Sequence, residues 1–352
     1  MNTIRKYQQG SPWPEGNHPH VLFILDTCNS FEQSLLKGWI EHHSQPEGAA
    51  AQTVCIDLSD DHRSIDSVLL VNALTLPIDT VVAPLRIAWL PSQESIHSGP
   101  RLRDLIFGDP RHPNPRRGRK ILKTAPQRMH LLSGKPDSVA NLHVRFELHH
   151  KMDNGDTQRD FADFVARQAS VVLDLAERRL QGGRYKVPRH VAANLLASSS
   201  YNEALNNLSV DSGIAKAQLV KEAKGYLDEM VSRPSMFWLD VYAKFNNFCL
   251  GLGYEAEIVC NQDAVEKLRQ IVREYPSILL WTHKTYLDGM VLPKLLYDND
   301  FPMPHMFGGA NLNFPGLGFL LHRSGAIFIR RSFRDNELYK MTLRHYVGYL
   351  MG

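Results

Sequence analysis

The chain has 352 residues, of which 43% are hydrophobic and 22% are charged. This composition is typical of a folded chain with a sizeable core, and it excludes a fibrous, intrinsically disordered or disulfide-stapled protein. Forty Lys and Arg residues against 37 Asp and Glu residues give a net charge of +3, which is too small by itself to indicate a nucleic-acid-binding protein. The length leaves room for two or three domains.

The sequence shows no export signal and no membrane-spanning helix. Residues 1–16 lack the apolar stretch of a secretory signal. The longest apolar region, Val68 to Leu90, is interrupted by prolines and charges and never reaches the roughly 18–20 apolar residues of a spanning helix. The four cysteines have no C-x-x-C spacing, so we expect reduced, buried thiols and neither a metal nor a cofactor.

Residues 1–150 have the pattern of an α/β region. Short apolar runs rich in β-branched residues predict three strands, and helical spacing between the first two predicts a helix: Val21–Leu25, Thr53–Asp57 and Val81–Trp89, with Phe31–His42. Residues 108–118 are rich in Pro, Gly and Arg and predict a loop.

Residues 151–254 are predicted to be helical. One helix has Phe161, Phe164, Val165, Val172 and Leu175 on one face and ends at Gly182–Gly183; a second opens at Pro188, and a third covers Ile214–Met230. The segment from Met236 to Leu252 is dense in large apolar side chains. It fits either a helix buried among the others or a surface that touches lipid or an acyl chain.

From residue 255 to 352 the pattern changes to strand, helix, strand. We expect strands at Glu257–Cys260 and Ser277–Trp281, with an amphipathic helix at Asp263–Glu274 between them. The second strand is apolar throughout and should be buried. Polar residues follow its carboxyl end, where open α/β sheets place their binding sites.

His283 and Asp288 follow that strand as an H-x-x-x-x-D pair. A histidine beside a carboxylate can act as a general base, because the carboxylate fixes the ring tautomer and stabilises the imidazolium. By itself the pair is a weak signal, since about one is expected by chance in a chain of this composition. The alternative interpretation is a structural His–Asp contact without a catalytic role.

Arg330 and Arg331 directly follow a second apolar run, Ala326–Ile329. Two guanidinium groups at a strand end suit a phosphate, which they can bind through bidentate hydrogen bonds. A solvated turn is the other reading of adjacent arginines.

Taken together, these segments resemble the bacterial glycerol-3-phosphate 1-O-acyltransferases in the form found in actinobacteria. Residues 283–289 match the first motif of that family and residues 325–333 match the second. The bridge at 302–305 and 309–314 and the upstream stretches 81–91 and 109–111 are also similar. The resemblance implies an acyltransferase-type α/β catalytic region over residues 255–352.

The resemblance also implies roles for individual residues. His283 would deprotonate the 1-hydroxyl of glycerol 3-phosphate and Asp288 would orient it. Arg330 and Arg331 would hold the phosphate, with Gly325 allowing a close backbone approach. The acyl donor would be acyl-CoA or acyl carrier protein, and the reaction would be the first step of phospholipid synthesis at the cytoplasmic face of the cell membrane, to which the protein would bind peripherally.

The sequence departs from the family in lacking its third and fourth motifs, which lie beyond the second. This departure implies the first part of a catalytic domain, and we expect little activity from the chain alone. The alternative is therefore a non-catalytic fragment that retains membrane or partner docking. A basic cluster could dock anionic lipid or be a solvated loop, and it lacks the interleaved aromatics of a nucleic-acid site: Arg111, Arg116, Arg117, Arg119, Lys120, Lys123 and Arg128.

Overall fold

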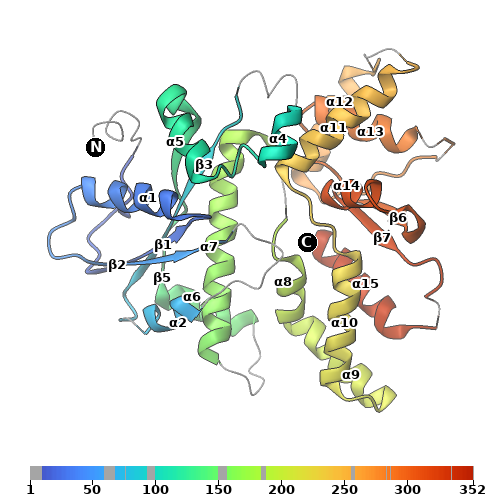
Figure 1. Cartoon of the computed structure of the whole chain (residues 1–352). Helices are drawn as coiled ribbons and strands as arrows, with labels where there is room; N and C mark the ends of the chain where they lie inside the picture. The colour runs from blue at the N-terminus through green and yellow to red at the C-terminus, as the bar shows by residue number, and fades with distance from the viewer. Residues whose placement is uncertain are drawn as a thin grey trace. The chain divides into compact units, whose positions relative to one another are not determined.

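The computed structural model describes residues 10–58, 68–75, 77–92, 100–149, 157–183, 188–254, 258–282, 284–285, 287–333 and 335–351. The chain divides into two compact units, Met1–Gln181 (unit 1) and Gly182–Gly352 (unit 2), which are described separately (Figure 1). Both contain helices and strands, so the α/β fold class is confirmed. The predicted helical region 151–254 is shared between the units, because its first long helix lies in unit 1.

Unit 1 is built around one mixed sheet with the strand order β2-β1-β3-β4. The central strand β1 (His20–Asp26) pairs in parallel with β2 (Ala50–Ile56) and β3 (Val81–Trp89). Strands β4 (Met129–Ser133) and β5 (Asp137–Ser138) pair with β3 in the antiparallel direction. All nine residues of β3 are buried, which explains its largely apolar sequence, in which Arg86 is the one charged residue. The three predicted strands are confirmed: β3 has the predicted ends, and the ends of β1 and β2 are shifted by one to three residues.

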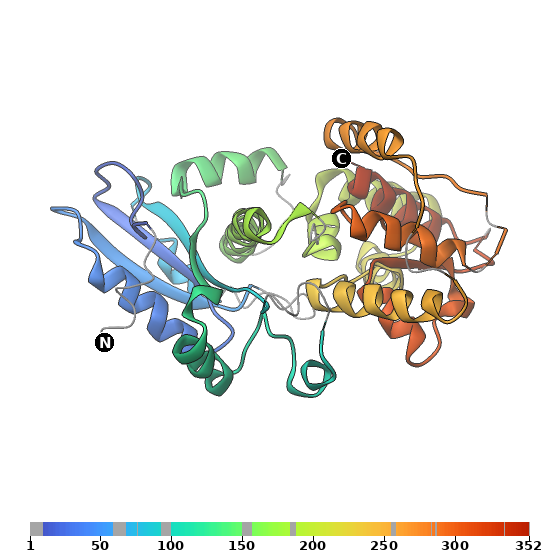
Figure 2. The ribbon, with the colours of Figure 1, turned by 90° about the horizontal axis from the view of Figure 1, so that it is seen from above.

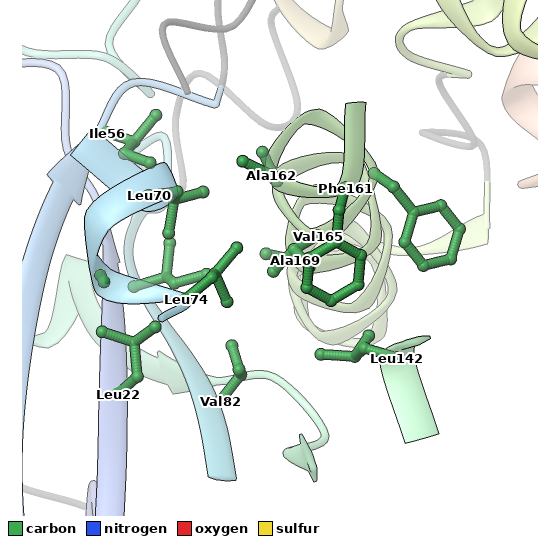
Figure 3. Packing of buried hydrophobic residues seen from close by; sticks show 14 of the residues in the cluster. Leu22, Ile56, Leu70, Leu74, Val82, Leu142, Phe161, Ala162, Val165 and Ala169 are labelled. Carbon is green, nitrogen blue, oxygen red and sulfur yellow. The ribbon is translucent and has the colours of Figure 1, made fainter. Parts of the chain in front are cut away.

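Helices cover both faces of this sheet. The helix α1 (Ser30–His42), whose first amides bond to the Asn29 side chain, packs on the face formed by Val21, Phe23 and Leu25. On the opposite face, Leu22, Ile24 and Val82 meet α2 (Val68–Ala73), α6 (Val139–His149) and α7 (Thr157–Gln181) (Figure 3). Alternate residues of β1 therefore enter opposite cores, as the pleat of a strand requires.

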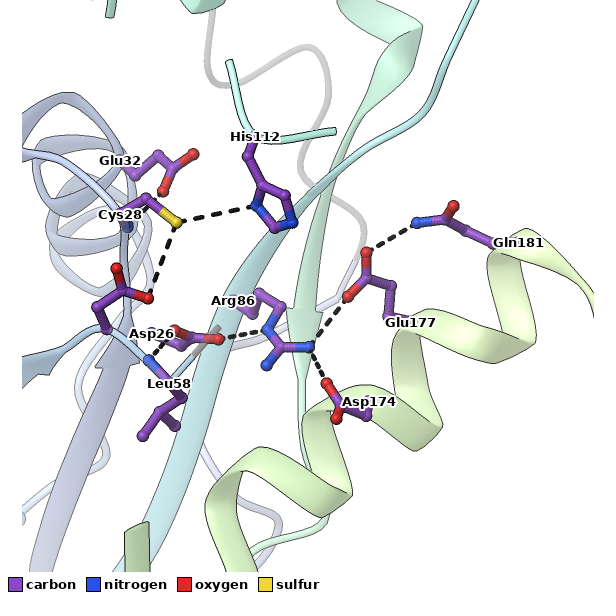
Figure 4. A network of polar contacts seen from close by, with 10 residues as sticks. Asp26, Cys28, Glu32, Leu58, Arg86, His112, Asp174, Glu177 and Gln181 are labelled. Carbon is purple, nitrogen blue, oxygen red and sulfur yellow. Dashed lines mark hydrogen bonds and ion pairs between the residues drawn. The ribbon is translucent and has the colours of Figure 1, made fainter. Parts of the chain in front are cut away.

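A buried charge network joins the sheet to α7. Arg86 on β3 is 5% exposed; its Nε donates to Asp26 at the end of β1, and its Nη1 donates to Asp174 at 2.6 Å and Glu177 at 3.0 Å (Figure 4). Burial by itself would lower the pKa of the guanidinium, but the three carboxylates raise it well above its ordinary value. The arginine therefore stays charged at any physiological pH and holds α7 against β1 and β3.

Some predictions for unit 1 are wrong. The loop predicted for 108–118 ends at Asn114, because Asn114 caps α5 (Pro115–Thr124) and Pro115 fits its first position. Leu175 does not share the buried face of α7: it is 43% exposed, whereas Leu173 and Glu177 in the same part of the helix are buried. Cys28 is exposed rather than buried, because it lies in the turn between β1 and α1.

The described part of unit 1 also includes the helix α4 (Leu102–Phe107) and the single turn η2 (Pro126–Arg128). Arg117 of α5 connects α4 to α5, since its Nη2 lies 2.6 Å from Asp104 Oδ1 and its Nη1 donates to the Gly108 carbonyl at 2.8 Å. Figures 1 and 2 show α4 and α5 along the same edge of unit 1.

Unit 2 combines many helices with two short parallel strands. Its first four helices are α8 (Val191–Ala197), α9 (Ser199–Ser212), α10 (Lys216–Met230) and α11 (Met236–Gly251). The next are α12 (Gln262–Glu274), α13 (Asp288–Asp298), η4 (Ala310–Leu312), α14 (Leu317–Arg323) and α15 (Glu337–Met351). Strands β6 (Met306–Gly309) and β7 (Ala326–Ile329) pair in parallel. The core joins β7 to α8, α9, α10 and α15.

Unit 2 departs from the sequence-based predictions in three places. The second helix begins at Val191, after a left-handed residue at His190, and not at Pro188. The described part of the predicted strand Glu257–Cys260 is not a strand, and Val259 is 92% exposed. The segment Ser277–Trp281 is neither a strand nor buried, since Leu280 is 91% exposed. An apolar run satisfies the pattern of a strand, but a strand also needs a neighbour to pair with, and the described sheet of unit 2 consists of β6 and β7.

The apolar segment Met236–Leu252 forms α11 and ends one residue early, at Gly251. One side of the helix is buried, including Phe237, Leu239 and Tyr242, whereas Phe248 is 65% exposed. The buried side supports the interpretation as a helix packed among the others, and the exposed Phe248 leaves a surface that could touch lipid or an acyl chain. Among the helices that the structure describes, none combines the length and apolar character needed to cross a bilayer.

Replacing Arg86 with Met should lower the free energy of unfolding of unit 1 by about 3–5 kcal/mol at pH 7, because three carboxylates lose their buried cation. Denaturant unfolding at pH 7 measures the loss. Arg179→Met, on an exposed position of α7, is the control and should change stability by less than about 0.5 kcal/mol. Equal effects of the two substitutions would contradict a structural role for the network.

Candidate active site

The candidate site lies in unit 2, at the carboxyl ends of its two parallel strands. Met306 pairs with Ala326 and Gly309 with Ile329, so both strands end at the same edge. Asn311 follows β6 and Arg330 and Arg331 follow β7. The strand Ala326–Ile329, inferred from the sequence, is confirmed. Parallel strands commonly present binding residues at this edge.

Arg331 and Asn311 meet across this edge. The Nη2 of Arg331 donates to the Oδ1 of Asn311 at 3.1 Å. Gly309 makes room for the pair, because a Cβ there would lie 2.5 Å from that same oxygen and 3.8 Å from the Arg331 Nε. The contact uses one donor of a guanidinium that has five, and Arg331 is exposed, so this group can bind a solvent-borne anion.

Arg330 is bound differently. It makes a bidentate ion pair with Glu229 of α10, with Nε at 2.9 Å from Oε1 and Nη2 at 2.5 Å from Oε2. Its guanidinium carbon also lies 5.1 Å from the ring centre of Tyr226 and 5.4 Å from that of Tyr339. The hydrogen bond to Glu229 raises the pKa of Arg330 above its ordinary value. The two adjacent arginines therefore have distinct environments, which the sequence pattern did not distinguish.

Gly325 lies in the turn that enters β7. Its φ of +106° is a backbone conformation that other residues rarely adopt. Its carbonyl accepts a hydrogen bond from the Met306 amide at 3.2 Å, and a Cβ would approach the Pro304 carbonyl to 3.4 Å. In this structure Gly325 thus sets the start of β7 against β6.

The Asp288 carboxylate organises the turn that precedes α13. Its Oδ2 accepts the backbone N–H groups of Lys284 at 2.7 Å and Thr285 at 2.9 Å. His283, together with Tyr286 of the same motif, lies outside the described residues. Asp288 is the first residue of α13, where a negative charge also interacts favourably with the helix dipole.

Helix α11 fixes the start of α13. The Tyr242 hydroxyl donates to the Gly289 carbonyl at 3.1 Å, and the Asn246 amide lies 3.5 Å from the Met290 carbonyl. Burial raises the pKa of the Tyr242 hydroxyl, so it remains a neutral donor. These two polar residues lie within the apolar segment, and they connect it to the motif that begins at residue 283.

Reasoning from the sequence missed a second polar cluster in unit 2. The Ser232 hydroxyl lies 2.9 Å from the Nδ1 of His305, and the Ser232 amide donates to the Tyr346 hydroxyl at 3.2 Å. Ser232 is 2% exposed, so these bonds fix the segment before β6 rather than present a nucleophile. His305 belonged to the recognised bridge, but neither Ser232 nor Tyr346 carried a motif. The contacts of Asn311 with Arg331 and of Glu229 with Arg330 were also not predicted from the sequence.

Comparison with known proteins relates part of this unit to acyltransferases. Residues 262–352 match the Acyltransferase family model. Over 157 residues the chain is 32% identical to "Putative acyltransferase plsB1" of Mycobacterium bovis and of Mycobacterium tuberculosis, an alignment covering 45% of this chain and 25% of each relative. Over 234 residues it is 28% identical to a glycerol-3-phosphate acyltransferase of Pasteurella multocida, covering 63% of this chain and 28% of that protein.

The C-terminal part of the chain therefore carries an acyltransferase domain, and the chain is homologous to glycerol-3-phosphate acyltransferases. It spans about a quarter of the length of these relatives. The matched region contains Asp288, Gly325, Arg330 and Arg331, together with Asn311.

Asp288→Ala should free the amides of Lys284 and Thr285, since each loses a charge-assisted acceptor. We expect their hydrogen exchange to become at least about tenfold faster, with a stability loss of about 1–2 kcal/mol. Native-state exchange followed by NMR measures both. Asp298→Ala, at the other end of α13, is the control and should leave these two amides unchanged. Unchanged exchange in Asp288→Ala would show that the carboxylate does not hold the turn.

Proposed function

We propose that the protein is a glycerol-3-phosphate 1-O-acyltransferase of the actinobacterial type, with its chemistry in unit 2. The observation that carries the proposal is the Arg331–Asn311 pair at the carboxyl edge of β6 and β7, inside the region that matches the Acyltransferase family. An exposed guanidinium oriented by an amide is suited to a phosphate monoester. The similarity to a protein named glycerol-3-phosphate acyltransferase supports this choice of substrate.

In the proposed reaction His283 is the general base. It takes the proton from the 1-hydroxyl of glycerol 3-phosphate as that oxygen attacks the carbonyl carbon of an acyl thioester. The C–S bond then breaks, the thiolate leaves and takes up a proton, and the acyl ester remains on the substrate. Asp288 would orient His283, and its two bonds to the backbone support a role in fixing the segment beside that histidine.

Arg330 and Arg331 have different roles in this proposal. Arg331 would contact the phosphate first, because its described partner is a neutral amide. Arg330 would join by exchanging Glu229 for phosphate oxygens, or would hold the strand end in place. Gly325 would act through the backbone geometry of β7. The donor would be acyl-CoA or acyl carrier protein, and the reaction would be the first step of phospholipid synthesis at the cytoplasmic face of the cell membrane, with the protein bound peripherally.

His283→Ala should reduce thioester release in the presence of glycerol 3-phosphate to the uncatalysed background, because no other group in the proposal removes the hydroxyl proton. The measurement is release of free thiol from acyl-CoA, with product identified by mass spectrometry. His322→Ala, a histidine at the end of α14, is the control and should retain the wild-type rate. Turnover that survives in His283→Ala would exclude this histidine as the base.

One observation favours the alternative of a non-catalytic chain with a docking function. The apolar stretch Ser277–Trp281, directly before the first motif, is exposed and unpaired with β6 or β7. A site on an unpaired segment is held less firmly than one on a sheet. The alternative predicts that wild-type turnover is itself close to background and that His283→Ala leaves membrane binding unchanged.

Binding of glycerol 3-phosphate tests the phosphate site without requiring turnover. Arg331→Gln should weaken binding by about tenfold to a hundredfold, because a charged hydrogen bond is worth about 1.5–3 kcal/mol. Isothermal titration calorimetry measures the change. Arg344→Gln, which removes an exposed arginine of α15, is the control and should bind as the wild type does. Equal affinities in all three proteins would remove Arg331 from the site.

A further inference from the structure

The basic cluster between Arg111 and Arg128 separates into two groups in the structure. Three of its arginines have structural partners: Arg111 Nε donates to Gln181 at 3.0 Å, Arg128 Nε donates to the Leu90 carbonyl at 2.7 Å, and Arg117 pairs with Asp104. The other four are exposed on α5, and they are Arg116, Arg119, Lys120 and Lys123; of these, Arg119 also places its guanidinium carbon 5.0 Å from the ring centre of Phe31.

The four exposed cations share one face of α5. With 3.6 residues per turn, positions 116, 119, 120 and 123 fall within about a third of the helix circumference. The opposite face holds Gly118 and Ile121, which are buried. Gly118 allows close packing, since a Cβ there would lie 2.8 Å from the Phe31 ring. The ten residues of α5 include no Asp or Glu, so this face has a single sign of charge.

An exposed apolar group lies at the end of α4, the helix that Arg117 joins to α5. Leu105, Ile106 and Phe107, the last three residues of α4, are 48%, 78% and 68% exposed. The Arg117 contacts with Asp104 and Gly108 bracket these three residues and fix the end of α4 relative to the start of α5. Both ribbon views place the two helices along one edge of unit 1 (Figures 1 and 2).

We infer that this α4–α5 surface, defined by Leu105, Ile106, Phe107 and the four exposed cations of α5, docks unit 1 onto a bilayer containing anionic lipid. The cations match the phosphate-bearing headgroups, and three adjacent apolar side chains can enter the headgroup–acyl boundary. A free phosphate ion would leave the apolar group unused. The surface lies outside the region matched to the acyltransferase family, and its function as a docking site does not depend on acyl transfer.

The test is co-sedimentation of the full chain with vesicles of phosphatidylcholine alone or mixed equally with phosphatidylglycerol. We expect binding to the mixed vesicles that weakens as salt rises. Each basic residue near such a surface contributes about fivefold to binding. The triple variant Arg116→Gln, Lys120→Gln, Lys123→Gln should therefore bind about a hundredfold more weakly. The matched control Lys135→Gln, Lys221→Gln, Lys224→Gln removes the same charge from exposed positions elsewhere and should bind as the wild type does.

The apolar part is tested by Ile106→Ser, Phe107→Ser, with Ile78→Ser, Val210→Ser as the control at other exposed apolar positions. The first pair should lower binding at high salt, where the apolar contribution dominates, and the second should not. Equal binding to both vesicle types, equal loss in the two charge variants, or no vesicle binding by the wild type would overturn the inference. Displacement of bound vesicles by short duplex RNA or DNA, with tighter binding to the nucleic acid, would assign the surface to that partner instead. Circular dichroism checks that each variant is folded.

Discussion

The arrangement of unit 1 depends on the buried ion pairs of Arg86. Arg86 comes from the middle of the sheet, and its partners come from two places in the sequence: Asp26 at the end of β1, and Asp174 and Glu177 on α7. Desolvating one cation and three carboxylates costs more free energy than an apolar contact would, so the network mainly selects one arrangement among those that hydrophobic packing would allow. The apolar layers between β1, β3 and α7 permit α7 to slide or rotate, whereas the paired charges define its register. The face that α1 covers has a smaller counterpart, in which the buried Glu32 accepts the Trp89 indole N–H at 2.9 Å.

The sequence was sufficient for most of unit 1 because its signals are local. The strands β1 and β3 are rich in apolar and β-branched residues, the Asn29 cap precedes an amphipathic helix, and Gly182–Gly183 follows the end of α7. The missed features depend on partners far away in the chain. Nothing near Arg86 indicates that its carboxylates lie 88 and 91 residues later. The start of α5 could have been read from Asn114 and Pro115, but the density of Pro, Gly and Arg suggested a loop.

Unit 2 shows the limit of pattern reasoning more clearly. Ala326–Ile329 and Ser277–Trp281 have similar apolar sequences, yet the first is a buried strand and the second is exposed and irregular. The difference is the presence of a parallel neighbour, because β7 pairs along its whole length with β6. The candidate site residues could be located by motif, but their environments could not. Asp288 was expected to serve a histidine, and its described bonds go to the Lys284 and Thr285 amides, which no spacing rule would reveal.

Arg86 and Arg330 show how burial decides what an arginine can do. Both are paired with carboxylates of their own chain, but the side chain of Arg86 is 6% exposed and that of Arg330 is 43% exposed. Removing carboxylates from Arg86 would leave a desolvated cation, so its partners cannot be exchanged for a ligand at reasonable cost. Around Arg330 water screens both charges, and an exposed ion pair contributes only about 0–1 kcal/mol. A phosphate could therefore replace Glu229 with little loss, while the rings of Tyr226 and Tyr339 keep the guanidinium in place. Under the proposed function, Glu229 would hold Arg330 in position for the phosphate, and the adjacent Arg331 would make the first contact with it.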